Sequence, residues 1–341
     1  MTSSFEKREI GKTGLEVTVL GFGGAPLGDF FEAIPEDRAL ATVEAAYAAG
    51  VRVYDTSPYY GHGLSEHRFG HVLRGKSRDD LVLSTKVGRL LRPAPAETID
   101  RGLFKGGLNF AATFDYSYDG CMRSLEDSYQ RLGMNRIDIA LIHDVDIWTH
   151  GSREAYEQRV RESMQGAYRA LDELRTAGVI RAIGVGVNEV EACMRFAGEG
   201  DFDCFLLAGR YTLLEQDGLA DLFPLAEKKG FSFLLGGPFN SGILAIGARP
   251  GATYNYVPAP PEIMDRVARI EAVCGRHDVP IAAAAIQFPL GHPRVASIIP
   301  GAVRPDEVTR NAELIQRQIP AALWDELRAE GLLAEDAPVP G

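Results

Sequence analysis

Four polar side chains that can move a proton stand at, or just after, the ends of three apolar runs in the sequence. They are Asp55, Tyr60, Lys86 and His143. The runs at 51–54, 81–86 and 137–143 contain the β-branched and alternating residues typical of strands. The first run by itself favours an ordinary structure, in which the aspartate caps a turn and the tyrosine ring packs nearby. The repetition at three strand ends favours a shared site.

A tyrosine beside a lysine can act as a proton-transfer group. A phenol has an unperturbed pKa of about 10, and a neighbouring ammonium favours the phenolate. We therefore expect Lys86 to lower the pKa of Tyr60, and Asp55 to hold Lys86 charged and in place. His143 would orient a substrate oxygen. The set suits moving a proton on or off an oxygen while a hydride moves at the carbon, and it contains no nucleophile.

Predicted strands and helices alternate along the chain, which indicates one parallel sheet. Eight units without a linker predict closure into a (β/α)8 barrel, an α/β TIM barrel that spans 1–341 as a single domain. In such a barrel the catalytic residues lie at the C-terminal ends of the strands. The predicted strands are 17–20, 51–54, 81–86, 137–143, 182–186, 204–208, 231–235 and 295–299.

Segments outside this alternation complete the predicted barrel. Residues 6–20 have the turn residues of an N-terminal β-hairpin, and 320–332 have the apolar spacing of a C-terminal helix. The segment 87–116 carries glycines, prolines and aromatics without a helical period, so it is predicted as a long loop at the C-terminal face. The segment 163–176 is predicted as one helix.

Charge and cysteine content narrow the classes of partner. The 341 residues carry a net charge of -11, which disfavours nucleic acid and anionic membranes because their phosphates would be repelled. The N-terminal residues lack the apolar run of a signal peptide, and no segment predicts a membrane span. The four cysteines form no CxxC pair, so we expect a reduced cytoplasmic setting and no metal site.

The stretch around Tyr60 resembles the signature of the aldo-keto reductases. It contains Asp-Thr-Ser-x-x-Tyr-Gly at 55–61, followed by Ser65-Glu66. The resemblance covers almost the whole chain and implies a general acid or base at Tyr60, together with a nicotinamide cofactor held in the barrel without a Rossmann domain. Segments that fall where the family has its catalytic lysine, its histidine, its fifth strand and its cofactor-binding end are 84–86, 141–143, 182–186 and 299–311.

The resemblance also implies a set of cofactor contacts, with some departures from the family pattern. Asn188 stands one place later than the residue that holds the carboxamide in many members, and Gly236 replaces the usual ring-stacking tyrosine. The implied positions are Gly23, Asn188, Arg210, Gly236, Pro238, Phe239, Ser241, Gly301, Arg304, Glu307, Arg310 and Asn311.

Two of these positions bear on the choice between NAD and NADP. Members that prefer the 2′-phosphate carry basic residues where this chain has Gly301 and Glu307. A carboxylate repels a phosphate dianion and can accept hydrogen bonds from free ribose hydroxyls, so we expect NAD. Arg304 and Arg310 keep NADP open as the alternative, because either can bind a phosphate.

Strings such as 21–28 and 239–242 resemble one branch of the family. That branch contains D-threo-aldose (L-fucose) 1-dehydrogenases, L-galactose dehydrogenases and pyridoxal 4-dehydrogenases, whose substrates form cyclic hemiacetals that lose a hydride to become lactones. We expect an aldose such as L-fucose, D-arabinose or L-galactose, with pyridoxal as the alternative. The predicted substrate contacts are Tyr59, His62, Asp144, Trp148 and His150.

Other classes of function stay open beside this reading. One is a general NADPH-dependent aldehyde reductase, and another is a regulatory barrel subunit without turnover, against which the intact catalytic set argues. A dehydrogenase class that uses Tyr-x-x-x-Lys is excluded, because none of the 12 tyrosines has a lysine four residues later.

Overall fold

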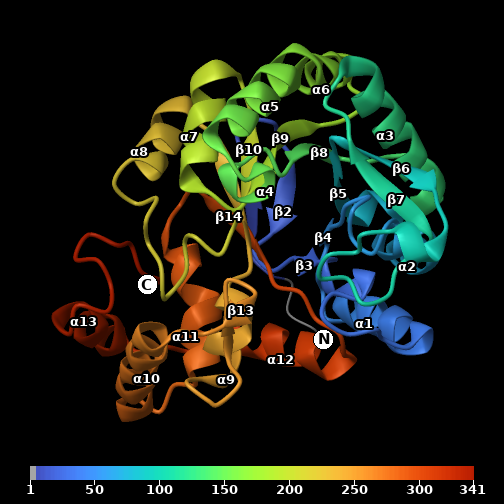
Figure 1. The fold of residues 1–341 in the computed structure, drawn as a ribbon. Helices are drawn as coiled ribbons and strands as arrows, with labels where there is room; N and C mark the ends of the chain where they lie inside the picture. Colours follow the sequence, from blue (N-terminus) through green and yellow to red (C-terminus); the bar gives the residue numbers. More distant parts are fainter. Residues whose placement is uncertain (1–4) are drawn as a thin grey trace.

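Eight parallel strands form a closed barrel in the computed structural model, which describes residues 5–341 (Figure 1). Residues 1–4, part of the segment in which the sequence predicts no signal peptide, lie outside the described residues. Bridges between Leu20 and Ile298 and between Gly23 and Gly301 join the first strand to the last. The predicted (β/α)8 barrel is confirmed. In spatial order the strands are β3 (Phe22–Gly23), β4 (Val53–Asp55), β5 (Val82–Val87), β8 (Ile139–His143), β9 (Ala182–Val187), β10 (Cys204–Ala208), β11 (Ser232–Gly236) and β14 (Val295–Ile299).

Helices surround these strands, and α1 and α12 pack side by side next to the closing seam (Figure 1). Local signals explain where they begin and end: the Ser117 hydroxyl caps α3 by accepting from Gly120 N, and Gly133, with φ 60°, ends it. The helices are α1 (Glu36–Ala48), α2 (Leu64–Leu73), α3 (Tyr118–Leu132), α4 (Ile147–His150), α5 (Arg153–Gln165), α6 (Ala167–Thr176), α7 (Val190–Glu199), α8 (Leu222–Lys229), α9 (Ile243–Ile246), α10 (Pro261–Arg276), α11 (Ile281–Gln287), α12 (Pro305–Leu314) and α13 (Ala321–Ala329). Short 3₁₀ turns lie at Pro26–Gly28, Arg78–Asp80, Ala96–Thr98, Asn240–Gly242 and Phe288–Gly291.

The first barrel strand differs from the prediction. Residues 17 and 18 do not belong to it, because β2 (Glu16–Thr18) pairs antiparallel with β1 (Lys7–Glu9) in the predicted N-terminal hairpin. The chain joins the barrel sheet only after this hairpin, where Leu20 pairs with Ile298 and β3 pairs with β4. A Cβ at Gly21 would lie 2.6 Å from Ile299 Cγ2, so a side chain there would prevent the close approach that seals the seam.

Two further segments differ from the prediction. The expected loop 87–116 contains a hairpin of β6 (Arg89–Pro93) and β7 (Phe110–Phe114), whose strands are too short to give a periodic signal. The expected single helix at 163–176 is the end of α5 and the whole of α6, which meet at Gly166. A Cβ at Gly166 would lie 2.3 Å from the Tyr116 carbonyl oxygen, so the two helices meet where only glycine fits. A further short hairpin joins β12 (Thr253–Tyr254) to β13 (Val257–Pro258).

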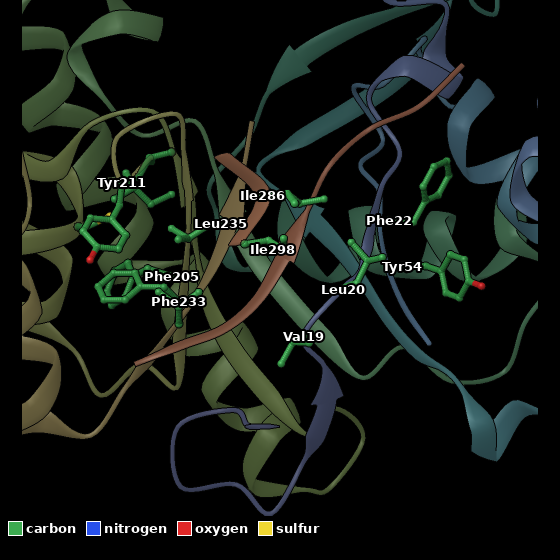
Figure 2. Close-up of a cluster of buried hydrophobic side chains, with 14 of the residues drawn as sticks. Val19, Leu20, Phe22, Tyr54, Phe205, Tyr211, Phe233, Leu235, Ile286 and Ile298 are labelled. Carbon is green, nitrogen blue, oxygen red and sulfur yellow. The ribbon is translucent and has the colours of Figure 1, made fainter. Parts of the chain in front are cut away.

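Two apolar layers hold the barrel together. Between strands and helices, the rings of Phe22 and Tyr54 both pack on Phe69 of α2, with centroids 5.7 Å from its ring, and Figure 2 shows them on the same side of the wall. Inside the barrel, Ile10 and Leu15 of the N-terminal hairpin region belong to one cluster with inward-facing strand residues. The hairpin region therefore closes the N-terminal end of the barrel. Among residues 5–341 no helix is long and apolar enough to cross a membrane.

The tight packing between β9 and β10 generates a stability prediction. A Cβ at Gly184 would lie 2.1 Å from the Cys204 carbonyl oxygen, which belongs to the neighbouring strand. We expect Gly184→Ala to lower the free energy of unfolding by about 2–4 kcal/mol, because the sheet must shift to admit the methyl group. Urea unfolding followed by circular dichroism measures this change.

The matched control is Gly275→Ala in α10, where a Cβ would have no neighbour within 4 Å. We expect this variant to be as stable as the parent or more stable by up to about 1 kcal/mol, since alanine is the better helix former. Equal unfolding midpoints for the two variants would contradict the packing argument.

Candidate active site

The alternation of side chains along the strands brings three of the four predicted catalytic residues to the inner face of the barrel. Inward-facing positions lie two residues apart in a strand. Val53 on β4, Val82 on β5 and Leu141 on β8 belong to the inner apolar cluster. Asp55, Lys86 and His143 stand an even number of residues further along the same strands. They therefore point into the barrel, just below its C-terminal mouth.

Asp55 and Lys86 form a buried ion pair. Lys86 Nζ donates to Asp55 Oδ2 at 2.6 Å and to the Thr56 carbonyl oxygen at 2.8 Å, and the residue is 1% exposed. The Ser84 hydroxyl donates to Asp55 Oδ1 at 2.8 Å. Burial raises the pKa of Asp55, whereas the charge and hydrogen bond of Lys86 lower it. Both carboxylate oxygens thus have donors, so the ammonium is fixed in place.

Tyr60 lies against this pair, with Lys86 Nζ 4.6 Å from the centre of its ring. Burial raises the pKa of Tyr60 well above 10, and the negative charges of Asp55 and Asp144 raise it further. The expectation that Lys86 lowers this pKa is therefore wrong for the protein by itself. The reason is that the Asp55 carboxylate neutralises the ammonium, which leaves desolvation as the largest effect.

His143 completes the set beside the Tyr60 ring. Its ring centre lies 5.7 Å from that of Tyr60, with the two rings nearly perpendicular. The backbone carbonyl of His143 accepts a hydrogen bond from the Tyr116 hydroxyl at 2.7 Å. Burial, Arg89 and Lys86 lower the pKa of His143 well below its usual range, so the imidazole is neutral at physiological pH.

A cavity of about 590 Å³ extends from Asp55 and Tyr60 across the C-terminal face of the barrel. Its walls come from the loops after β3, β9, β10, β11 and β14 and from the first two turns of α12. All of the predicted cofactor contacts line it, namely Gly23, Asn188, Arg210, Gly236, Pro238, Phe239, Ser241, Gly301, Arg304, Glu307, Arg310 and Asn311. The structure therefore gathers these scattered positions around one elongated space.

The chemistry of this lining fits a nicotinamide dinucleotide. Asn240 Oδ1 is buried in the wall without a hydrogen-bond partner, although its Nδ2 donates to Glu215 and to the Gly209 carbonyl. Among residues 5–341 the Asn188 side chain also forms no hydrogen bond, so both amides can serve a bound amide or hydroxyl group. At Gly236 a Cβ would meet only ordinary contacts of 3.4 Å or more, so the missing side chain enlarges the cavity.

The end of the cavity at α12 has a different charge arrangement from the predicted one. Glu307 Oε2 accepts from Val303 N at 2.8 Å, and Oε1 pairs with Arg304 at 2.7 Å. The carboxylate predicted to meet ribose hydroxyls is thus engaged in capping its own helix. Arg304 is balanced by Glu307 and Asp306, and within the described part of the chain Arg310 has no charged partner.

The predicted substrate contacts are less uniform. His62 is buried, with Nδ1 2.7 Å from the Phe110 carbonyl oxygen, and His150 lies behind Phe114 with ring centres 4.7 Å apart. Tyr59 and Asp144 both contact the guanidinium of Arg89. None of these side chains lines the cavity. Trp148 is 47% exposed and is not part of the lining either, but its ring lies 6.3 Å from that of Tyr256, which does line the cavity.

Aromatic side chains form a chain of ring contacts that begins at Tyr60, and among them the sequence analysis predicted only Trp148. Phe104 lies 6.2 Å from the Tyr60 ring centre, Phe30 lies 5.3 Å from Phe104, and Tyr256 lies 5.5 Å from Phe30. We call Phe30, Phe104, Tyr256 and Trp148 the aromatic arc. They come from four separate loops, so no local pattern links them. Arg89 was also missed, although its place three residues after Lys86 was a usable signal.

The sequence matches the Aldo/keto reductase family over residues 19–330. The chain belongs to this family. It is 44% identical to pyridoxal 4-dehydrogenase from Microbacterium luteolum, covering 96% of this chain and 98% of that protein. It is 40% identical to D-threo-aldose 1-dehydrogenase from a Pseudomonas species, with 94% and 96% covered. It is also 29% identical to L-galactose dehydrogenase from Arabidopsis thaliana, with 92% and 89% covered.

Solved structures show the same fold for this aldo/keto reductase. An aldo-keto reductase from Bacillus halodurans superposes with a TM-score of 0.74 at 24% identity, covering 95% of this chain and 96% of that one. A glycerol dehydrogenase from Gluconobacter oxydans gives a TM-score of 0.73 at 22% identity, with 98% and 97% covered.

The buried ion pair of this aldo/keto reductase generates a test. In Lys86→Met the Asp55 carboxylate would lose its only ion-pair partner among the described residues, and we expect the free energy of unfolding to fall by about 3–5 kcal/mol. In the double variant Asp55→Asn/Lys86→Met no charge is stranded, so we expect a loss smaller by at least about 2 kcal/mol. Urea unfolding of both variants measures the difference. A double variant less stable than the single one would contradict this account of the pair.

Proposed function

We propose that this aldo/keto reductase oxidises the hemiacetal hydroxyl of a small cyclic substrate to a lactone, with NAD as hydride acceptor. The observation that carries the proposal is the placement of Tyr60, Lys86 and Asp55 at one end of the cavity, where proton transfer and hydride transfer can meet. The relatives named above as dehydrogenases of pyridoxal and of D-threo-aldose support the oxidative direction.

Each side chain has a defined task in this oxidation. In its phenolate form Tyr60 takes the proton of the hemiacetal hydroxyl, and Lys86, held by Asp55, lies beside the ring that carries this negative charge before the transfer. His143 binds the reacting oxygen and fixes its direction. A bound oxidised nicotinamide supplies the acceptor for the hydride at its C4 and one positive charge. The carbon–oxygen bond becomes the lactone carbonyl as the proton and the hydride leave.

Pyridoxal is the substrate that the aromatic arc supports best. A flat pyridine ring needs an apolar slot with one polar end. Phe30 and Tyr256 line the cavity together with Tyr60, and Phe104 packs behind them against the rings of Phe30 and Tyr60. Two of the polar side chains predicted as substrate contacts are not free to bind the hydroxyls of a sugar, since Asp144 is paired with Arg89 and His62 is buried. This ordering reverses the sequence expectation, in which an aldose came first.

An aldose is the second candidate, and Trp148 favours it. Its indole is half exposed and contacts two residues of the cavity wall, with the Arg210 guanidinium 5.8 Å from its ring centre and the Tyr256 ring 6.3 Å away. Aromatic platforms beside charged donors suit the mixed faces of a sugar ring. D-threo-aldose 1-dehydrogenase is also nearly as similar to this chain as pyridoxal 4-dehydrogenase is.

The charges at α12 support NAD over NADP in a different way from the sequence argument. Arg304 is already neutralised by Asp306 and Glu307, so a 2′-phosphate dianion would have to displace these carboxylates or rely on Arg310 alone. The adenosine end of NAD brings no such charge. The preference therefore rests on the internal pairing of the helix rather than on a free carboxylate.

A substrate panel tests the proposal directly. We expect purified enzyme to reduce NAD with pyridoxal and, at lower kcat/KM, with L-fucose, D-arabinose or L-galactose, and to use NADP at least about tenfold less well because of the paired arginine. Absorbance of the reduced nicotinamide measures every combination. A preference for NADPH with aromatic aldehydes reduced and no hemiacetal oxidised would support the general reductase instead. Absence of turnover with every pair would support the regulatory barrel.

The raised pKa of Tyr60 predicts a pH dependence. A base must be deprotonated, and the phenolate fraction increases tenfold per pH unit below the pKa, so we expect kcat/KM for oxidation to rise with a slope of about 1 between pH 7 and pH 9. We expect Tyr60→Phe to lower kcat by about 10²–10⁴ and to abolish this rise. Initial rates across pH, together with NAD binding measured by fluorescence, check both points. Retention of more than about a tenth of kcat in the variant would remove Tyr60 from its role.

A further inference from the structure

Arg89, the first residue of β6, is a buried cation beside His143. The proposed reaction gives Arg89 no task. Its guanidinium carbon lies 4.2 Å from the ring centre of Tyr59 and 4.3 Å from that of Phe114. Nη1 also pairs with Asp144 Oδ2 at 2.8 Å. Two rings and a carboxylate therefore hold the guanidinium in one orientation.

This orientation bears on the protonation of the His143 ring. Arg89 Nη1 donates to His143 Nδ1 at 3.3 Å, and because a guanidinium has only donors, Nδ1 must be the acceptor. The Ser57 hydroxyl lies 3.1 Å from the same nitrogen and can donate or accept there, so Arg89, which can only donate, decides the tautomer. A neutral imidazole whose Nδ1 accepts carries its proton on Nε2.

We infer that Arg89 is a positioning residue that holds His143 as the neutral imidazole with its proton on Nε2, so that this proton is donated to the reacting oxygen. The identity of that oxygen rests on the proposed function, whereas the position of the proton does not. Arg89 itself acts through His143, since the rings of Tyr59 and Phe114 and the carboxylate of Asp144 already contact its guanidinium.

The charged groups around His143 explain why removal of Arg89 would change the protonation of the imidazole. Lys86 approaches from β5 and is neutralised by Asp55, and Tyr60 and Tyr116 contribute uncharged hydroxyls. Asp144 Oδ1 lies 3.3 Å from Nε2 and is balanced by Arg89 through its other oxygen. Without Arg89, an unpaired carboxylate would stand beside Nε2 and would favour the imidazolium. In the intact protein the cation opposes that charge state.

Three variants separate the charge of Arg89 from its geometry and from the charge of Asp144. Arg89→Met keeps an apolar chain between the rings of Tyr59 and Phe114 but leaves Asp144 unpaired. Arg89→Met/Asp144→Asn removes both charges, so it keeps the burial of His143 without a stranded carboxylate. Arg89→Lys retains the charge but loses the planar fork that directs a donor at Nδ1.

The experiment is nitrogen-15 NMR of the full-length protein with labelled histidine, titrated from pH 5 to pH 8 without substrate, and His143→Gln assigns the signal among the 7 histidines. In the parent we expect a neutral ring with the proton on Nε2 throughout. In Arg89→Met we expect the midpoint of protonation to move upward by at least about one pH unit. In the double variant the ring should again be neutral, with both tautomers populated, and Arg89→Lys should lie between.

Activity provides the second readout. At pH values below the new midpoint of His143 protonation, we expect kcat/KM of Arg89→Met to be lower than that of the parent. At higher pH it should recover partly, while NAD binding stays as in the parent. A parent ring with the proton on Nδ1 would overturn the inference, as would an unchanged tautomer in both methionine variants. If Arg89→Met does not fold, the double variant decides the tautomer. If NMR gives the expected result but no substrate of the panel turns over, the proposed function fails and the inference stands.

Discussion

A lysine and an aspartate share the interior of the barrel with almost no exposed surface. Such a pair is stable only if both partners are present and the remaining donors and acceptors are satisfied, since an isolated buried charge is strongly unfavourable. Ser84 and the Thr56 carbonyl provide those partners, and each stands next to the ion pair in the sequence or in the sheet. The requirement fixes the register of β4 against β5, where Asp55 lies opposite Ser84.

The neutrality of this pair has a chemical consequence. Because Asp55 neutralises the charge of Lys86, burial is the largest influence on Tyr60, and it raises the pKa of the phenol. A phenol of this kind donates or accepts a proton only when further positive charge is near. The same principle applies to His143, where Arg89 and Asp144 form a second balanced pair. Two neutral ion pairs therefore flank the groups that would act on the substrate.

The loops above the strands divide the cavity into two kinds of surface. Near α12 the lining is made of backbone, amides and paired charges, while near Tyr60 it is made of aromatic rings. The loops are tied together as well: Glu189 accepts from the backbone N–H groups of Ile147 and Trp148, and Asp146 accepts from that of Asn188. These bonds join the loop after β8, which carries Trp148, to the loop after β9, which carries Asn188, the candidate carboxamide contact. The two loops are therefore held in a fixed position relative to each other.

The sequence by itself determined the barrel and predicted the four candidate catalytic residues. Alternation of strand and helix is a local property of apolar spacing and of capping residues, and the position of Asp55, Lys86 and His143 at strand ends follows from the same pattern. The lining of the cavity also followed, because it was carried by short motifs near strand ends. Local signals could not separate β2 from the first barrel strand, since both are short and only three residues lie between them.

Only the tertiary structure decided how these groups affect one another. The pKa of Tyr60 depends on how deeply it is buried and on the pairing of Lys86, which are long-range properties. The engagement of Glu307 by its own helix, the burial of His62 and the assembly of the aromatic arc likewise depend on contacts between distant segments. Arg89 is the clearest case, because its orientation depends on two rings, a carboxylate and an imidazole that come together only in the folded barrel.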